Sequence, residues 1–225
     1  MKGSGPVRRR EACTKTRRRA LAAALTLTIA GMAGFTAAAP PAGTVLVLGD
    51  SLSAGYGVPA GQGWVDLLAR KMADTHPGFK VVNASISGET TFGGLERLPR
   101  LLKDHTPSVV VVELGANDGL RGMDLALTKG NLERIVSASR TAGAKTLVVG
   151  MRIPPNYGPV YTKRFFELFG DVAKASSSAY VPFLLEGLAG SRGNFQDDGI
   201  HPVAAAQPRI LENVLPSLST LLGKG

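Results

Sequence analysis

A regular alternation of short apolar runs with longer amphipathic stretches limits what this chain can fold into. Five runs of five to seven residues are rich in β-branched side chains and almost continuously hydrophobic, as in strands buried on both faces of a sheet. They are residues Thr44–Leu48, Phe79–Ala84, Ser108–Leu114, Lys145–Gly150 and Tyr180–Leu184. Strands that alternate with helices predict right-handed crossovers and a parallel sheet.

The stretches between the runs carry apolar residues at helical spacing, in sets that share a face: Trp64, Leu68 and Met72; Leu95, Leu98 and Leu102; Leu125, Leu132 and Val136. Pro99 is expected to limit the regularity of the second helix. Further helices are predicted over Thr162–Ser178 and Pro202–Leu222, the last broken into pieces by Pro208 and Pro216. Together these elements predict one three-layer α/β/α domain with a parallel five-stranded sheet in flavodoxin-like order.

The first 39 residues differ from the rest of the chain. Residues 1–19 carry eight Lys and Arg against one acidic residue, and residues 20–39 carry no charge. A basic segment, an apolar run and a small-residue cluster are typical of a secretory signal, so we expect residues 1–39 to direct export to the periplasm or the medium. Twenty uncharged residues could just span a bilayer, so a retained membrane anchor is the alternative. Thr16–Leu21 loosely fits a twin-arginine signal, which leaves the export route open.

Charge and cysteine content exclude several functions for the expected mature domain, residues 40–225. The chain has a net charge of +9, but after residue 39 only 18 Lys and Arg face 16 Asp and Glu. The basic character therefore belongs to the leader and gives no support to nucleic-acid binding. Cys13, the only cysteine, also lies in the leader, so the mature domain has no disulfide, thiolate nucleophile or cysteine metal site.

Polar residues and glycines concentrate in the loops that follow the predicted strands, at residues 49–57, 85–94, 115–122, 151–159 and 196–202. In a parallel sheet these loops meet at the carboxyl edge, where ligands bind. The first contains Gly-Asp-Ser, in which Ser51 could be a nucleophile, part of a phosphate loop or only a turn residue. Asp50 places a negative charge where a phosphate would sit, and no nucleotide-binding glycine motif follows a strand.

A serine nucleophile needs a base, and three histidines could supply it. His76 and His105 are predicted in helix-to-strand loops at the opposite edge. His201 follows the fifth strand, and Asp198 precedes it by three residues, so that one turn could hold the carboxylate against the imidazole. By itself this segment also fits an Asx turn before a helix that begins with proline. Its pairing with Ser51 favours a serine hydrolase.

An acyl-transfer site also needs hydrogen-bond donors for the developing oxyanion. The candidates are the backbone N–H of Ser51, the backbone of Gly88 and the side-chain amide of Asn117. Each could equally belong to an ordinary turn, but all three are predicted at the same edge. The H-E-x-x-H zinc motif and the G-x-S-x-G elbow are absent from the sequence, which predicts neither a metal nor a cofactor.

These residues carry a family resemblance. Residues 49–53 (GDSLS), Gly88, residues 115–118 (GAND) and residues 198–202 (DGIHP) resemble, in order, the four blocks of the SGNH (GDSL) hydrolases. The flanking segments are similar to the bacterial periplasmic thioesterase I/lysophospholipase/arylesterase subgroup. Ala116 departs from the glycine expected before the block-three asparagine, and Pro216 is unexpected in the final helix.

The resemblance implies an SGNH hydrolase domain over residues 40–225, with Ser51 as nucleophile, His201 as general base and then acid, and Asp198 as its orienting partner. It implies an oxyanion hole of Ser51, Gly88 and Asn117. The loop Gly119–Met123, with Gly119 and Leu120, is implicated in acyl-chain binding, and Pro155 and Tyr157 are expected to wall the same groove. The expected substrates are lysophospholipids, acyl thioesters and aryl esters.

The expected protein is a cofactor-free monomer that acts on small molecules, with transient lipid contact. A carbohydrate O-acetyl esterase or acyltransferase would use the same residues and is the alternative enzyme. A lipid-binding module with a vestigial site is the alternative that is not an enzyme.

Overall fold

The predicted strands form one parallel sheet in a computed structural model that describes residues 43–222. The strand order is β2-β1-β3-β4-β5, which is the flavodoxin-like order, and the predicted fold class is confirmed. The strands are β1 (Gly43–Gly49), β2 (Phe79–Asn83), β3 (Val109–Glu113), β4 (Lys145–Val149) and β5 (Ala179–Val181). Every residue of β3 is buried, whereas β2 is only half-buried because it lies at the edge of the sheet.

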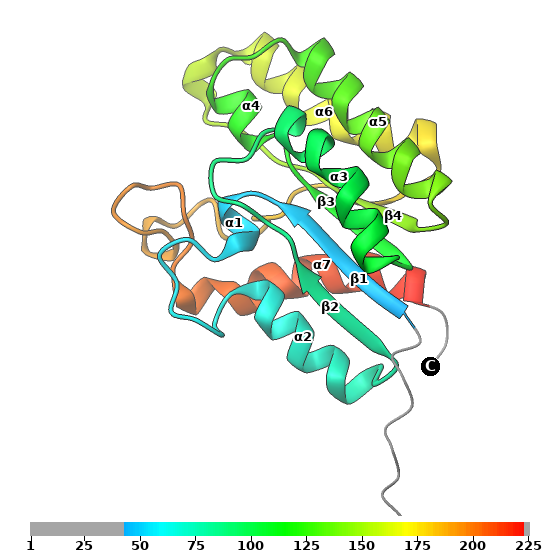
Figure 1. Cartoon of the computed structure of the whole chain (residues 1–225). Helices are drawn as coiled ribbons and strands as arrows, with labels where there is room; N and C mark the ends of the chain where they lie inside the picture. The colour runs from blue at the N-terminus through cyan, green and yellow to red at the C-terminus, as the bar shows by residue number, and fades with distance from the viewer. Residues whose placement is uncertain (1–42, 223–225) are drawn as a thin grey trace, which may run out of the picture. The chain divides into compact units, whose positions relative to one another are not determined.

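Helices cover both faces of the sheet. Helices α3, α5 and α6 pack together on one face, and α2 packs with α7 on the other (Figure 1). The helices are α1 (Ser51–Ala54), α2 (Trp64–Thr75), α3 (Thr91–His105), α4 (Ala116–Leu120), α5 (Leu125–Thr141), α6 (Pro159–Ser176) and α7 (Gln207–Leu222). Three short 3-10 turns complete the set: η1 (Pro155–Tyr157), η2 (Arg192–Asn194) and η3 (Ala204–Ala206).

The core lies between the sheet and these helices. On one face of the sheet, α2 and α7 are joined by a buried hydrogen bond, in which the backbone N–H of Trp64 donates to Gln207 Oε1 at 3.0 Å. On the other face, the rings of Phe165 and Phe169 meet edge to face at 5.2 Å, and both are fully buried. This packing holds the carboxyl ends of the strands in fixed positions.

The last predicted strand, Tyr180–Leu184, is too long. Strand β5 ends at Val181, because Pro182 follows and has no N–H to donate to a sheet ladder. The chain stays beside β4 through two isolated bonds, in which Gly150 N–H donates to Val181 O and Leu184 N–H donates to Gly150 O.

The prediction that proline would interrupt two helices is wrong. Helix α3 continues through Pro99, and α7 runs unbroken from Gln207 to Leu222 through Pro216. Pro208 is the second residue of α7, where no intrahelical N–H bond is needed. Tertiary packing outweighs the missing bond at Pro216, because α7 buries an apolar stripe that includes Ile210, Val214 and Leu218.

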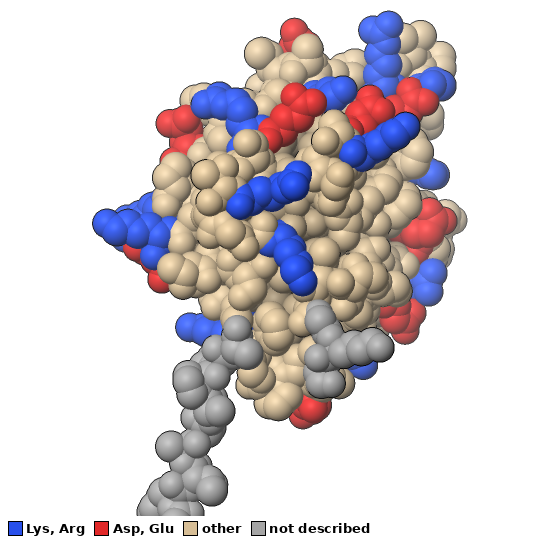
Figure 2. All heavy atoms as spheres, turned by 90° about the vertical axis from the view of Figure 1, so that its right-hand side faces the viewer, with Lys and Arg blue, Asp and Glu red and all other residues tan. Residues whose placement is uncertain are grey.

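The amino-terminal edge of the sheet differs from the carboxyl edge. His76 follows α2 and His105 ends α3, so both lie at the amino-terminal edge, as predicted, where they are half-buried. Figure 2 shows the molecule from the side of this edge, with Lys and Arg interspersed among Asp and Glu.

The predicted signal peptide, residues 1–39, lies outside the described residues, and so does its boundary with the following domain. Residues 43–222 all belong to one compact unit. Within that range, no helix is both long enough and apolar enough to cross a membrane.

Replacing Pro216 by alanine is expected to stabilise the protein. Pro216 is exposed, so the change restores a helical N–H without removing core packing. A proline in a helix interior costs about 3 kcal/mol, partly offset because proline also restricts the unfolded chain by about 1 kcal/mol. Urea denaturation should therefore show a gain of roughly 1–2 kcal/mol in the free energy of unfolding. A loss of stability in Pro216→Ala would contradict this account.

Candidate active site

Asp50 turns the chain from β1 into α1. It is the N-cap of α1, and its Oδ1 accepts the backbone N–H of Leu52 at 3.0 Å. This bond starts the helix at Ser51, directly beyond the carboxyl end of β1. The Asp50 side chain is 1% exposed, and this burial raises its pKa to about 6.

Asp198 and His201 form a closed turn in the connection between β5 and α7. Oδ1 of Asp198 accepts the backbone N–H groups of Ile200 and His201 at 2.8 and 3.0 Å. Its Oδ2 lies 2.6 Å from Nδ1 of His201. These hydrogen bonds, led by the one from the His201 backbone, lower the pKa of Asp198 to about 2. The Asx turn and the carboxylate–imidazole pair are therefore both present in one segment.

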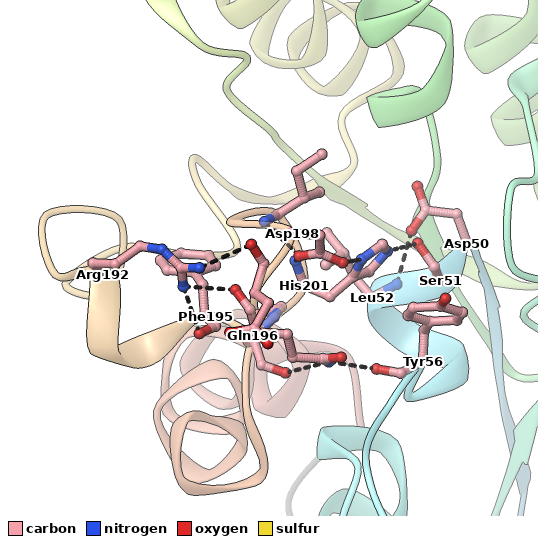
Figure 3. A network of polar contacts seen from close by, with 12 residues as sticks. Asp50, Ser51, Leu52, Tyr56, Arg192, Phe195, Gln196, Asp198 and His201 are labelled. Carbon is pink, nitrogen blue, oxygen red and sulfur yellow. Dashed lines mark hydrogen bonds and ion pairs between the residues drawn. The ribbon is translucent and has the colours of Figure 1, made fainter.

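His201 joins this turn to Ser51. Its Nε2 lies 2.8 Å from Ser51 Oγ, across 150 residues of sequence (Figure 3). Because Asp198 is ionised and only accepts hydrogen bonds, Nδ1 of His201 carries a proton. In the neutral ring Nε2 is then the acceptor, and the Ser51 hydroxyl donates to it. The arrangement can move a proton from the serine oxygen to the imidazole.

The side chains of three further residues hold the two loops in shape and against each other. Nε2 of Gln196 donates to the carbonyl oxygen of Tyr56 at 2.8 Å and to that of Pro202 at 3.2 Å. The ring of Tyr56 lies 4.5 Å from the His201 ring, between centroids. Arg192 donates to three carbonyl oxygens of the loop that carries Gln196, those of residues 195–197. These contacts fix the distance between Ser51 and His201 (Figure 3).

The predicted oxyanion donors lie around the same serine. Gly88 sits in a turn closed by Glu89 N–H to Ile86 O, and its φ of +80° is one that favours glycine. Within the described residues, the backbone N–H groups of Ser51 and Gly88 donate to no other group. Arg121 crosses from the end of α4 and donates to the Gly88 carbonyl at 3.0 Å, which holds the turn in place.

The side-chain amide of Asn117 is already hydrogen-bonded. It donates to the carbonyl of Glu89 at 2.9 Å and to Asp50 Oδ2 at 3.2 Å. An oxyanion beside Ser51 would have to share or replace the longer of these bonds, the one to Asp50. The Asp50 carboxyl thus holds both the turn that presents Ser51 and the amide expected to serve as a donor.

A second buried carboxyl lies beneath Asp50. Glu113, at the end of β3, is 2% exposed, and its Oε2 accepts the Ser53 hydroxyl at 2.6 Å. Burial, and then the charge of Asp50, raise the pKa of Glu113 well above its usual value. Ser53, the second serine of this loop, is therefore tied to the sheet and has a structural role.

A cavity of about 540 Å³ opens beside the serine. Its walls are mainly apolar and include Leu52, Ala116, Leu120, Ile153, Phe183 and Ile200. Of the four residues expected to bind substrate, Leu120 and Pro155 line it. The methyl group of Ala116, a departure from the family pattern, forms part of the wall.

The other two expected binding residues lie elsewhere. Gly119 is buried in α4 against the ring of Phe165, where a Cβ atom would come within 2.4 Å, so this glycine serves close packing. Tyr157 is not among the lining residues. Its hydroxyl donates to the Leu120 carbonyl at 2.7 Å, so it supports the cavity wall from behind.

Five residues contribute to the site in ways that were not predicted from the sequence: Asp50 as the N-cap of α1, Glu113, Arg121, Arg192 and Gln196. Asp50 had a usable signal, because an aspartate followed by a short helix is a common N-cap. The others act through contacts between distant segments, which leave no local pattern.

A parallel α/β sheet with a Ser–His–Asp hydrogen-bond chain at its carboxyl edge defines the class of serine hydrolases. Residues 47–207 match the GDSL-like Lipase/Acylhydrolase family. The chain belongs to that family, as its four sequence blocks predicted.

Individual relatives show which members of the family the chain is similar to. It is 53% identical over 179 residues to Esterase TesA of Pseudomonas aeruginosa, covering 80% of this chain and 89% of the relative. It is 44% identical over 188 residues to Thioesterase 1/protease 1/lysophospholipase L1 of Escherichia coli K12, covering 84% and 88%. The crystal structure of the esterase EstA from Pseudoalteromonas, inhibited by monoethylphosphonate, has a TM-score of 0.76 at 40% identity and covers 80% of this chain and 98% of that one.

The stability of the fold is expected to depend on the ionisation of Asp50. Its pKa rises from 3.8 to about 6 on folding, so between these values the folded protein binds more protons than the unfolded chain. The free energy of unfolding should therefore fall as pH rises through this window, by up to about 3 kcal/mol. Urea denaturation at several pH values should show a smaller fall in Asp50→Asn. The same dependence in both proteins would contradict the assignment.

Proposed function

We propose that this protein hydrolyses carboxylic esters and thioesters through an acyl-enzyme on Ser51. The observation that carries the proposal is the hydrogen-bond chain from Ser51 through His201 to Asp198, beside an apolar cavity. A serine hydroxyl is a weak nucleophile unless a base removes its proton, and His201 is placed to do so.

In the first step Ser51 Oγ attacks the acyl carbon while its proton passes to Nε2 of His201. Asp198 then faces an imidazolium, and its carboxylate stabilises that charge without taking up the proton. Collapse of the tetrahedral intermediate breaks the bond to the alcohol or thiol, which leaves with the proton from His201. In the second step His201 removes a proton from water, the water attacks the acyl-enzyme, and the acid is released as Ser51 regains its proton.

The oxyanion of each intermediate would receive hydrogen bonds from the backbone N–H groups of Ser51 and Gly88. Asn117 would supply the third by turning its amide from Asp50 toward the new charge. The two backbone donors are already oriented and need little rearrangement when the charge forms. Arg121 supports this arrangement through the carbonyl of Gly88.

The proposed substrates are lysophospholipids, acyl thioesters and aryl esters, with the acyl chain in the apolar cavity. The relatives named for esterase, thioesterase and lysophospholipase activities support this range. The protein would act as a monomer and contact lipid only transiently. Activity on a series of acyl chain lengths separates it from a carbohydrate O-acetyl esterase or acyltransferase, since a strict acetyl preference would favour the latter.

Ser51→Ala is expected to fold normally and to lose labelling by a fluorophosphonate together with turnover of p-nitrophenyl acyl esters. The matched control is Ser53→Ala, on the same short helix, which should still be labelled because, of the two serines, only Ser51 is hydrogen-bonded to His201. Mass spectrometry of the labelled protein identifies the modified residue. Unlabelled but folded wild-type protein would instead favour a binding module with a vestigial site.

We also propose that the protein is exported, with residues 1–39 as the signal peptide. The support is the composition of that segment, basic and then uncharged. Fractionation of expressing cells, followed by mass measurement of the intact protein, tests it. A soluble product that has lost about 39 residues is expected. A full-length product in the membrane fraction would favour a retained anchor.

A further inference from the structure

Large apolar side chains that are exposed gather at one edge of this protein. Among the described residues there are seven, and the least exposed is Tyr157, at 36%. The other six, called here the apolar rim, are Tyr56, Ile86, Phe92, Leu127, Val160 and Ile200. All lie in loops that follow strands or in the first turns of α3, α5 and α6, which is the carboxyl edge of the sheet (Figure 1).

Single exposed apolar residues are common on protein surfaces, but they are normally scattered. Here all six rim residues lie at the edge of the sheet that carries the site. Within residues 43–222, no large apolar side chain is exposed at the amino-terminal edge. That edge instead presents charges of both signs (Figure 2).

Three rim residues lie next to residues that form the site around Ser51. The Tyr56 ring lies on the His201 ring at 4.5 Å. Ile200 precedes His201 and also lines the apolar cavity. The backbone N–H of Ile86 donates to the Gly49 carbonyl, two residues before Ser51. At Ile200 the rim therefore meets the cavity proposed for the acyl chain.

The charges near the rim suit a phospholipid surface. Residues 51–63 and 84–88 contain no charged side chain, so this part of the rim could enter an apolar layer without desolvating a charge. Two arginines line the cavity, Arg152 and Arg192, and Arg121 lies beside Gly88. None of the three has an acidic partner among the described residues. Arg121 and Arg192 already donate to backbone carbonyls, and Arg152 lies over the rings of Phe166 and Phe183. It is therefore the positive charge of these groups that suits a phosphate-bearing surface.

We propose that the apolar rim binds the surface of a phospholipid layer, so that the acyl chain of a single lipid passes from that layer into the cavity. The inference rests on the proposed function and adds the physical state in which the substrate is met. Lipids with one long chain aggregate in water. An enzyme bound to the aggregate can take up the acyl chain without exposing it to water.

The test uses Ser51→Ala protein, which cannot consume the lipid, and flotation with vesicles of phosphatidylcholine and lysophosphatidylcholine. These lipids carry no net charge, so general electrostatic attraction is small. The protein is expected to float with the vesicles. Adding Phe92→Ser, Leu127→Ser and Val160→Ser, at the most exposed rim positions, should weaken binding roughly tenfold or more, because interfacial affinity scales with buried apolar area.

The matched control alters the opposite ends of the same three helices, through Lys103→Ser, Arg140→Ser and Lys174→Ser. It should change vesicle binding by less than about twofold, as surface substitutions away from an interface do. With Ser51 intact, both triple variants should hydrolyse soluble p-nitrophenyl acetate at about the wild-type rate, because none of the six positions touches the serine, the histidine or the cavity.

Failure of the Ser51→Ala protein to float, or equal flotation of both triple variants, would overturn the inference. So would a dimer in sedimentation velocity that the rim substitutions dissociate, because the rim would then join two copies of this chain. If the wild-type protein did not hydrolyse p-nitrophenyl acetate, that result would count against the proposed function instead. The two failures are distinct because binding is measured in the inactive variant.

Discussion

The site depends on the hydrogen bonds of the buried Asp50 carboxyl. It caps the short helix that begins at Ser51 and accepts a hydrogen bond from the Asn117 amide, so that it joins the loops after β1 and β3. Burial makes its charge costly, and Glu113 lies beneath it as a second buried acid. The fold thus holds two carboxyls in an unfavourable environment, where their hydrogen bonds position the nucleophile and one proposed oxyanion donor.

The two sides of the site are held together by different means. The serine side is part of the sheet, through the β1–α1 turn and the bond from Ser53 to Glu113. The histidine side is a loop with only short 3-10 turns, given its shape by Arg192, Gln196 and the turn around Asp198. The loop can stay precise because its carbonyl groups are bonded within the protein. A reaction that transfers a proton between two atoms 2.8 Å apart requires such precision.

Much of the fold was predictable because its signals are local. Continuous β-branched runs marked the strands, and only the end of β5 differed by more than one residue, where Pro182 interrupts the ladder. The helices through Pro99 and Pro216 were not predictable from propensity, because burial of their apolar stripes compensates for the lost hydrogen bonds. In the site, the sequence placed Ser51, His201 and Asp198 at one edge. Of the residues expected to bind substrate, Leu120 and Pro155 line the cavity beside the serine, whereas Gly119 and Tyr157 do not.

The sequence by itself determined the class of fold, the edge that carries the site and the residue types available there. Those properties follow from periodicity and from the direction of parallel strands, which need only local information. The tertiary structure alone decided that Asp50 holds Asn117, that Arg121 holds the turn of Gly88, and that exposed apolar side chains lie at the same edge of the sheet as the serine. Each of these joins segments far apart in the chain, and only packing of the complete sheet and its helices sets such distances.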